Sequence, residues 1–235
     1  MNALAATACT DRPPCDLWQP KLEVIRLGRA AYAPTLALQH RLARRVRSEP
    51  DRATLLLVEH DPPVITLGRR GRRSDVLASR EELAAAGVEV HRVLRGGQAT
   101  CHSPGQLVAY AILHLHCLGL TLREYVARLE DAAVLTLRRF GLAARRDDAQ
   151  PGVWIDGAKV AFVGVAVRRW VTSHGLAINV SNDPRCFEWI VPCGRAGGHM
   201  TSLVERLGRE VAVAEVAGVL EESFAEVFGF QAGAT

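Results

Sequence analysis

The sequence predicts an α+β fold in which a mixed or antiparallel sheet packs with helices. Three observations favour it. β-rich runs and amphipathic helical runs alternate along the chain without the regular strand–helix–strand repeat of a parallel-sheet protein. One long pair of β-rich runs is joined by Asp156-Gly157, a dipeptide typical of tight hairpin turns. At 235 residues, 49% of them hydrophobic, the chain is long enough to bury a core.

The N-terminal half is predicted to hold four strands and two helices. Strands are expected at 21–28, 53–60, 63–68 and 88–94, and helices at 30–47 and 79–86. The Asp61-Pro62-Pro63 sequence separates the second strand from the third. Residues 95–106, "RGGQATCHSPGQ", are dense in Gly, Pro and small polar residues, and we expect a loop there.

The second half begins with an apolar strand at 107–115, followed by a helix. Thr121 and Glu124 form a capping box, which predicts a helix start there and an end near Phe140. The hairpin at 152–170 turns at Asp156-Gly157 and places Lys159 at the start of its second strand. A strand at 173–180, an irregular loop at 181–200, a capped helix start at Ser202 and a terminal helix at 211–229 complete the chain. Residues 1–20 are expected to be a flexible leader and 21–235 a single domain.

Composition argues against several classes of protein. The net charge of +4 is mild, and paired arginines are scattered rather than interleaved with stacking aromatics, so nucleic-acid binding is not indicated. A solvated arginine surface and a surface that steers an acidic protein partner both fit this pattern. No apolar run reaches membrane-spanning length, and residues 1–15 lack the charged start of a signal peptide.

The cysteines do not form a recognisable metal or disulfide framework. None of the six is in a Cys-x-x-Cys pair; they are Cys9, Cys15, Cys101, Cys117, Cys186 and Cys193. His114, His116 and Cys117 lie close together in the sequence, but buried or edge histidines explain them better than a metal site. We therefore expect free thiols, no metal and a cytoplasmic protein.

Three segments have the composition of a site. "RGGQATCH" at 95–102 has paired glycines that let a backbone approach a ligand closely, with Arg95 and His102 at its ends. Lys159 is one of only two lysines among 29 basic residues, and a lysine can exchange protons where an arginine stays charged. Cys193 sits between a proline and glycines in "IVPCGRAGG", where a thiol can be aimed at a ligand. An ammonium nearby would favour its thiolate, although an inert cysteine and a lysine at a strand edge are the ordinary explanations.

Taken in order, five segments resemble the lipoate-protein octanoyltransferases. They are "VEHDPPVITLGRRG", "RGGQATCHSPGQLVAY", "GVWIDGAKVAFVGVAV", "VTSHGLAINV" and "IVPCGRAGGHMTSL", which run from about residue 50 to 210. The resemblance implies the fold shared with biotin and lipoate ligases, a mixed sheet packed with helices plus a smaller sheet. It also implies a monomer that needs no cofactor.

The resemblance further implies a reaction. Cys193 would take the octanoyl group from octanoyl-acyl carrier protein as a thioester, then pass it to a lysine of an apo lipoyl domain. The acceptors would be the lipoyl domains of 2-oxoacid dehydrogenase complexes and the glycine cleavage H protein. Lys159 would hold Cys193 as thiolate and shuttle protons, which a guanidinium cannot do.

By the same resemblance, three segments line an acyl pocket. Its residues are Arg95, Gly96, Gly97, Gln98, Ala99, Thr100, Cys101, His102, Phe162, Val163, Gly164, Gly175, Leu176 and Ala177. His102 is expected to make a polar contact near the acyl carbonyl, whereas Phe162 and Leu176 also fit plain core positions. The chain departs from the family pattern at Leu94, Cys101 and Ser103, which puts the preferred acyl length in question.

Two alternatives remain open at this stage. "GRRGRR" at 68–73 has some similarity to a ligase nucleotide loop, so an ATP-dependent lipoate ligase or a lipoyl amidotransferase on the same fold is the first. The second is a carrier-protein-binding module without turnover. The presence of both Cys193 and Lys159 favours the transferase over either.

Overall fold

The protein is built around a seven-stranded mixed sheet with helices on both faces, seen in a computed structural model that describes residues 20–147, 150–191 and 199–231. The strand order is β1-β2-β6-β10-β9-β8-β7. The strands are β1 (Lys21–Ala30), β2 (Arg52–His60), β6 (Gln106–Ile112), β7 (Arg145–Asp147), β8 (Gln150–Ile155), β9 (Ala158–Arg168) and β10 (Val171–Asn179). Only β1 and β2 pair in parallel, and the other pairs are antiparallel, so the predicted mixed sheet is confirmed.

A second, three-stranded sheet packs beside the first. Its order is β4-β3-β5, with β3 at Val64–Leu67, β4 at Glu89–Arg92 and β5 at Ala99–His102. The predicted strands at 53–60 and 63–68 therefore belong to different sheets, since the chain turns at the cis Asp61-Pro62 bond between them. The smaller sheet implied by the family resemblance is confirmed.

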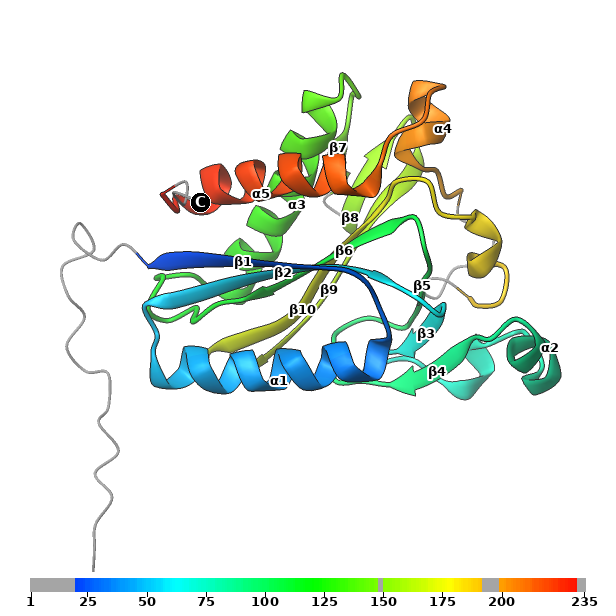
Figure 1. Cartoon of the computed structure of the whole chain (residues 1–235), viewed down its shortest axis with the longest axis horizontal. Helices are drawn as coiled ribbons and strands as arrows, with labels where there is room; N and C mark the ends of the chain where they lie inside the picture. The colour runs from blue at the N-terminus through cyan, green and yellow to red at the C-terminus, as the bar shows by residue number, and fades with distance from the viewer. Residues whose placement is uncertain (1–19, 148–149, 192–198, 232–235) are drawn as a thin grey trace, which may run out of the picture.

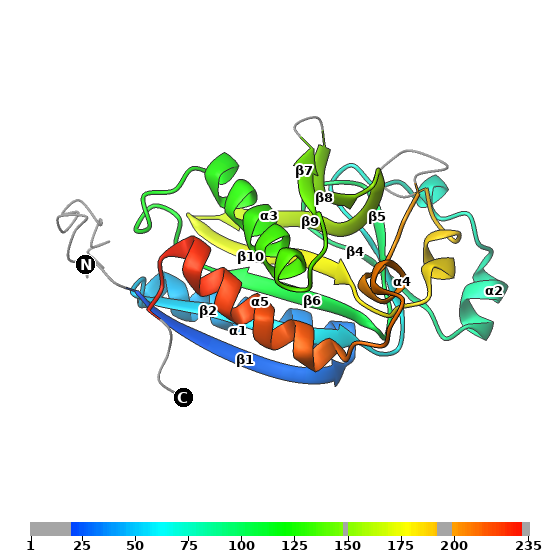
Figure 2. The same ribbon diagram turned by 90° about the horizontal axis from the view of Figure 1, so that it is seen from above.

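Helices cover the large sheet on both faces (Figures 1 and 2). α3 (Leu122–Arg139) and α5 (Val213–Phe228) lie on one face, and their apolar sides pack with the sheet into the main core. α1 (Tyr32–Ser48) lies on the opposite face, next to the small sheet. The shorter α2 (Arg80–Ala85) and α4 (Leu203–Leu207) lie at the periphery.

Local sequence signals account for the helix starts. Ser79, Thr121 and Ser202 each accept a hydrogen bond from the backbone N–H three residues later, which satisfies a donor that the first turn of a helix leaves unpaired. For Ser79 and Thr121 the reciprocal glutamate contact completes the capping box. The capped starts at Thr121 and Ser202 were predicted as such and are confirmed.

Three local predictions were wrong. Residues 95–106 are not loop throughout, because Ala99–His102 pair with β3 as strand β5. The strand expected at 107–115 ends at Ile112, and the chain turns through His114 and His116. Residues 184–187 of the expected irregular loop form a 3-10 turn, η2 (Pro184–Phe187). The expected leader lies almost wholly outside the described residues.

Candidate functional site

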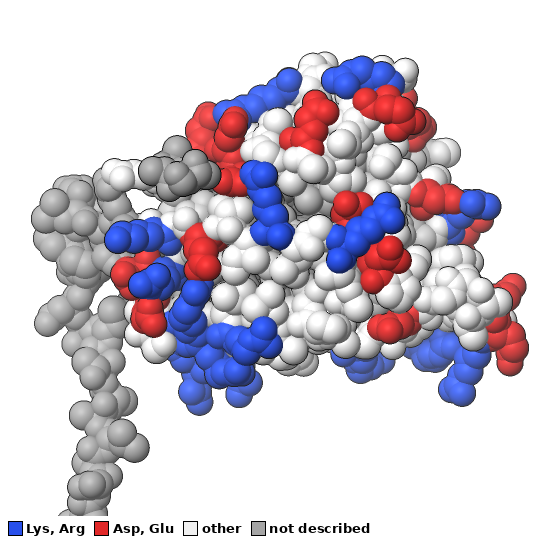
Figure 3. Space-filling model, in the orientation of Figure 1, with Lys and Arg blue, Asp and Glu red and all other residues white. Residues whose placement is uncertain are grey.

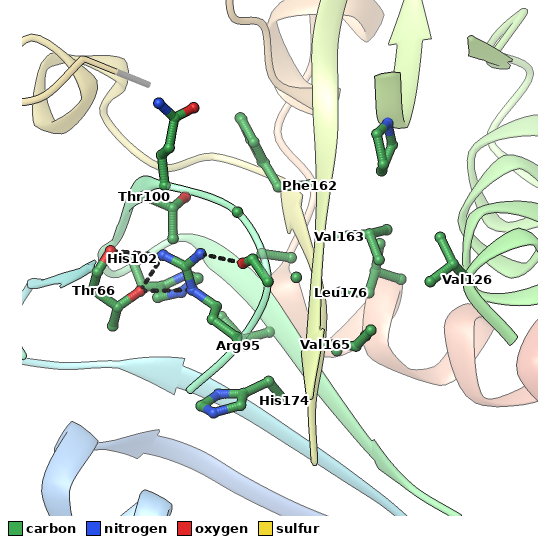
Figure 4. A pocket seen from close by; sticks show the side chains of 18 of the residues that line it. Thr66, Arg95, Thr100, His102, Val126, Phe162, Val163, Val165, His174 and Leu176 are labelled. Carbon is green, nitrogen blue, oxygen red and sulfur yellow. Dashed lines mark hydrogen bonds between the residues drawn. The ribbon is translucent and has the colours of Figure 1, made fainter. Parts of the chain in front are cut away.

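A cavity of about 390 Å³ opens where the edge of β9 meets the small sheet. Figure 4 shows its two sides: Val126, Val163, Val165 and Leu176 lie on one side of the ribbon, and Thr66, Arg95, Phe162 and His174 on the other. The outer edge of β9 is bridged at one point by the 95–98 loop, where the Gly96 N–H donates to the Val165 carbonyl at 2.8 Å. The cavity extends from this edge of β9 across β10 to β6, since residues of all three strands line it.

Two glycines make this packing possible. Gly164 and Gly175 are cross-strand partners on β9 and β10. A Cβ at Gly175 would come within 2.1 Å of the Ala109 carbonyl oxygen, and one at Gly164 would lie 3.1 Å from Cδ of Arg95. The space left by these glycines is thus filled by the neighbouring backbone and by the Arg95 side chain.

Lys159 lies at the rim of the cavity, and only 7% of it is exposed. Its Nζ donates to the Pro151 carbonyl at 2.8 Å and stands over the rings of Trp154 and Phe162, with 4.8 and 5.2 Å to their centroids. An ammonium held over aromatic faces is stabilised by the negative charge density of the rings. Lys159 is thus a buried side chain that also borders the cavity.

A buried carboxylate lies behind this lysine. Glu130, on α3, accepts a hydrogen bond from the Gly152 N–H at 2.7 Å. Burial raises the pKa of Glu130, while the Gly152 N–H, Arg146 and Lys159 act in the opposite direction. Glu130 thereby fixes the β8 backbone against which the lysine side chain rests.

The described residues that flank the Cys193 segment are tied to the same region. The His199 carbonyl accepts from the Lys159 N–H at 2.8 Å, and the Thr201 N–H donates to the Lys159 carbonyl at 3.0 Å. On the other side, the Val191 N–H donates to the Asp75 carbonyl at 2.8 Å. Cys193 itself lies outside the described residues, so its predicted position beside Lys159 remains a prediction.

His102 belongs to a buried polar network that reaches Lys159. Its Nδ1 lies 2.6 Å from Oε1 of Gln106, whose Nε2 donates to Oδ1 of Asn179 at 2.9 Å. Asn179 donates in turn to the Thr201 carbonyl at 3.0 Å, and Thr201 is bonded to the Lys159 backbone. Burial, with a contribution from His60, lowers the pKa of His102 to about 3. The imidazole is therefore neutral, and the contact with Gln106 leaves Nε2 as its acceptor.

Arg95 is a buried cation on the small-sheet side of the cavity. Its guanidinium donates to the Thr66 carbonyl and hydroxyl and to the Gly96 carbonyl, at 2.6 to 3.1 Å. Its charge adds to burial in lowering the pKa of His174, which is about 4. Arg95 thus joins β3 to the 95–98 loop and sets the potential at this end of the cavity.

Comparison with known proteins identifies the family. Residues 31–225 match the lipoyl protein ligase A/B catalytic domain family. The chain is 42% identical to an octanoyltransferase of Caldicellulosiruptor saccharolyticus, with 89% of each chain covered. It is 43% identical to the human mitochondrial octanoyl-acyl-carrier-protein:protein N-octanoyltransferase, covering 89% of this chain and 94% of the relative. The chain belongs to the octanoyltransferase family. It is an acyltransferase.

Solved structures support the fold alone. A bipartite lipoate protein ligase from Thermoplasma acidophilum superposes with a TM-score of 0.72 at 18% identity, covering 92% of this chain and 86% of that one. A biotin protein ligase from Aquifex aeolicus superposes with a TM-score of 0.52 at 15% identity, covering 89% and 69%. The biotin/lipoate ligase-like fold predicted from the resemblance is confirmed.

Most of the residues predicted to form the acyl pocket of this octanoyltransferase meet at the cavity. Thirteen of the fourteen line it, together with Lys159. Cys101 is the exception, because alternate residues of β5 face opposite ways: Thr100 and His102 face the cavity, while Cys101 packs in the core behind it with Cys186 and Phe187. The expectation that Cys101 lines the pocket fails, since its segment is a strand and not a loop.

Several cavity residues were not predicted. Tyr32, Thr66, Val108, Tyr110 and His174 line it from elements far apart in the sequence. His174 adjoins Gly175 in "SHGLA", and Tyr110 ends the "GQLVAY" segment, so both lay inside recognised motifs. Tyr32, and Glu130 behind Lys159, sit on helices whose apolar pattern carries no sign of a site.

Among residues 20–147, 150–191 and 199–231, no group of three or more His, Cys, Asp or Glu side chains is arranged to hold a metal ion. Within the same residues, no helix has the length and apolar character required to cross a membrane.

Proposed function

We propose that the chain transfers an octanoyl group from octanoyl-acyl carrier protein to a lysine of an apo lipoyl domain, through a thioester on Cys193. Family membership supports the donor and the reaction, and the human relative is named for octanoyl transfer from acyl carrier protein to protein. The observation that carries the residue assignment is Lys159, a largely buried ammonium at the rim of the cavity, whose backbone is bonded to both His199 and Thr201.

In the first half-reaction, the Cys193 thiolate attacks the thioester carbonyl of the donor. The carbon–sulfur bond to the carrier arm breaks, and the departing thiolate takes a proton from the Lys159 ammonium. In the second half-reaction, the amine nitrogen of the acceptor lysine attacks the enzyme thioester. The neutral Lys159 amine takes the proton that this nitrogen loses. Cys193 leaves as thiolate, and an amide forms. Transfer of an acyl group from a thioester to an amide is favourable, so the two half-reactions need no nucleotide.

Separate features of the cavity support the binding of the octanoyl chain. Val163 and Val165 of β9 and Leu176 of β10 supply apolar surface to the cavity. His102 offers a neutral imidazole, held by Gln106, at the cavity wall. We propose that this imidazole positions the acyl carbonyl region. We further propose a monomer that acts in the cytoplasm on the lipoyl domains of 2-oxoacid dehydrogenase complexes and the glycine cleavage H protein.

The test is intact-protein mass spectrometry after incubation with octanoyl-acyl carrier protein. One octanoyl mass should be added, and peptide mapping should place it on Cys193, because the thioester is the resting intermediate when no acceptor is present. Cys193→Ser should remove the adduct, whereas Cys117→Ser, at another cysteine, serves as the matched control and should retain it. An adduct on any other cysteine, or no adduct in the wild type, contradicts the assignment.

The ligase alternative is tested by a different experiment. An ATP-dependent ligase forms an acyl-adenylate from free octanoate and needs tight ATP binding. Calorimetry that shows ATP binding, with octanoylation of the acceptor from free octanoate and ATP alone, would replace the transferase proposal.

A further inference from the structure

Residues 68–73, "GRRGRR", form a basic turn at the mouth of the cavity. The four arginines Arg69, Arg70, Arg72 and Arg73 are all exposed, and Arg70 lines the cavity itself. In Figure 3 basic side chains gather along the lower edge of the molecule, beneath α1 and beneath the small sheet. The turn follows β3 of the small sheet directly in the chain.

Backbone hydrogen bonds hold this turn against the site. The N–H groups of Gly68, Arg69 and Arg70 donate to carbonyls of the 95–98 loop at 2.9 to 3.1 Å. A Cβ at Gly68 would lie 2.5 Å from the Gly97 carbonyl oxygen, so the approach is possible only with glycine there. The backbone of the turn is therefore bonded to the cavity wall, while the four arginine side chains are exposed to solvent.

The residues that follow the turn are bonded to the chain that leads to Cys193. The Asp75 carbonyl accepts from the Val191 N–H at 2.8 Å, and the Leu77 N–H donates to the Trp189 carbonyl at 2.8 Å. The stretch 68–77 thus bonds at its start to the 95–98 loop and at its end to residues 189–191, the described flank of the segment that carries the proposed nucleophile.

The charges of this turn are not neutralised within the described part of the chain. No carboxylate there lies within 4.0 Å of the guanidinium groups of the four arginines, whereas Arg139 and Arg146 each contact two. The nearest acid in sequence, Asp75, accepts from the Arg72 backbone N–H at 2.8 Å. Four positive charges held close together repel one another, which lowers the stability of the fold. Binding of an anion relieves this repulsion and is therefore favoured.

We propose that this basic turn docks the donor, by binding the phosphodiester of its prosthetic arm and the acidic surface of the protein that carries it. This inference rests on the proposed function, since it names the surface that presents the octanoyl thioester to the same cavity. Arginine suits the task because its planar fork binds phosphate and carboxylate oxygens in pairs. Arg70, at the cavity rim, is placed for the phosphate end of the arm, and the other three for the carrier surface.

Charged groups at the edge of an interface act mainly on the rate of encounter and its dependence on salt. The inference therefore predicts an effect on the Michaelis constant for the carrier-bound donor, with little change in turnover once the donor is bound. It also predicts that kcat/KM for the carrier falls as ionic strength rises, because salt screens exposed charges over about 10 Å at 0.1 M.

The experiment compares three donors with one enzyme variant. The donors are octanoyl-acyl carrier protein, octanoyl-phosphopantetheine and octanoyl-pantetheine, which lacks both protein and phosphate. The variant is Arg72→Glu/Arg73→Glu, which avoids the cavity-lining Arg70. We expect KM for the carrier-bound donor to rise about tenfold, while kcat/KM for octanoyl-pantetheine stays within about twofold of wild type. Octanoyl-phosphopantetheine should respond to this variant as octanoyl-pantetheine does, because the phosphate is assigned to Arg70, which the variant keeps.

The matched control is Arg41→Glu/Arg44→Glu, the same charge change on exposed positions of α1. These residues lie 9 and 12 positions beyond Tyr32, or about 14 to 18 Å along the helix. This control should leave KM for the carrier within about twofold of wild type. An equal effect of the 72/73 variant on all three donors, or an equal effect of the α1 control, overturns the inference. Failure of the wild type to use any of the three donors would instead overturn the proposed function.

Discussion

At the scale of single residues, the site depends on a lysine in a place that suits few side chains. Lys159 has its Nζ between a carbonyl and two aromatic rings, and its Cε lies 2.4 Å from where a Cβ on Gly152 would be. An arginine would keep the charge, but its guanidinium stays protonated and is wider than an ammonium. The arrangement therefore separates two roles for the residue, as a fixed charge and as a proton carrier.

Lys159→Arg should lose most transfer activity, by roughly 100-fold or more, the range attributed to general acid–base catalysis. The measurement is the rate of octanoyl transfer to a lipoyl domain, with the thermal unfolding midpoint recorded on the same sample. Lys159→Met, which fits the space but carries no charge, is the companion variant and should also be inactive. Near wild-type transfer by the arginine variant would show that charge alone suffices.

The sequence indicated some of these residues and not others, for physical reasons. Lys159 stood out because arginine fills almost every other basic position, and His102 because it closes a glycine-rich segment. Glu130 gave no such signal, since a glutamate on an amphipathic helix ordinarily faces water. Here it is 6% exposed and bonded to a backbone N–H of β8. That contact joins residues 22 positions apart, which no local pattern reveals.

At the scale of elements, the edge of the large sheet is shaped by an irregularity in β8. The pairing of β8 with β9 shifts register between Val153 and Trp154, and Gly152 has a φ of +136°. An added Cβ there would lie 2.6 Å from the Ala161 carbonyl oxygen as well as against Lys159. Bulges of this kind re-aim side chains beside active sites. The hairpin and its turn were predicted from Asp156-Gly157, but a change of register within a strand leaves no periodic signal.

Gly152→Ala should therefore displace Lys159 and weaken the β8–β9 pairing. We expect a loss of at least about 2 kcal/mol in the free energy of unfolding, from strain at positive φ together with the clash, and a large loss of transfer. Gly157→Ala is the matched control: it too has positive φ, at +79°, but its Cβ would meet nothing within 4 Å. That control should cost about 1 kcal/mol and retain activity. Urea unfolding and transfer rates check both, and equal effects of the two variants would refute the role given to Gly152.

At the scale of the whole molecule, the helices and the mixed sheet followed from periodicity and capping, whereas the division into two sheets did not. β2 and β3 are consecutive β-rich runs, and nothing between them other than a proline turn marks that they enter different sheets. Their separation creates the interface in which polar side chains meet. His60 and Tyr110 come from the large sheet, Tyr32 from α1 and His102 from the small sheet. A hydrogen bond of 2.7 Å joins His60 Nε2 to the Tyr110 hydroxyl, so this interface is polar as well as buried.

This buried histidine cluster should make the stability of the molecule depend on pH. Burial lowers the pKa of His60 and His174 to about 4 and that of His102 to about 3. In the unfolded chain these groups regain ordinary values near 6.5. Below that pH the unfolded chain binds more protons than the folded one, so the stability present above pH 6.5 is lost as pH falls toward 4 and 3.

Three such groups give a slope of up to about 4 kcal/mol per pH unit. Most carboxyl groups contribute below pH 5, so urea unfolding at pH 7, 6 and 5 mainly follows the histidines; Glu130, whose pKa is raised by burial, acts in the opposite direction. His174→Asn removes one of them and suits the positive φ of 58° at that position, and it should reduce the slope by about a third. A free energy of unfolding that is unchanged or higher at pH 5 would show that the cluster is protonated in the folded protein.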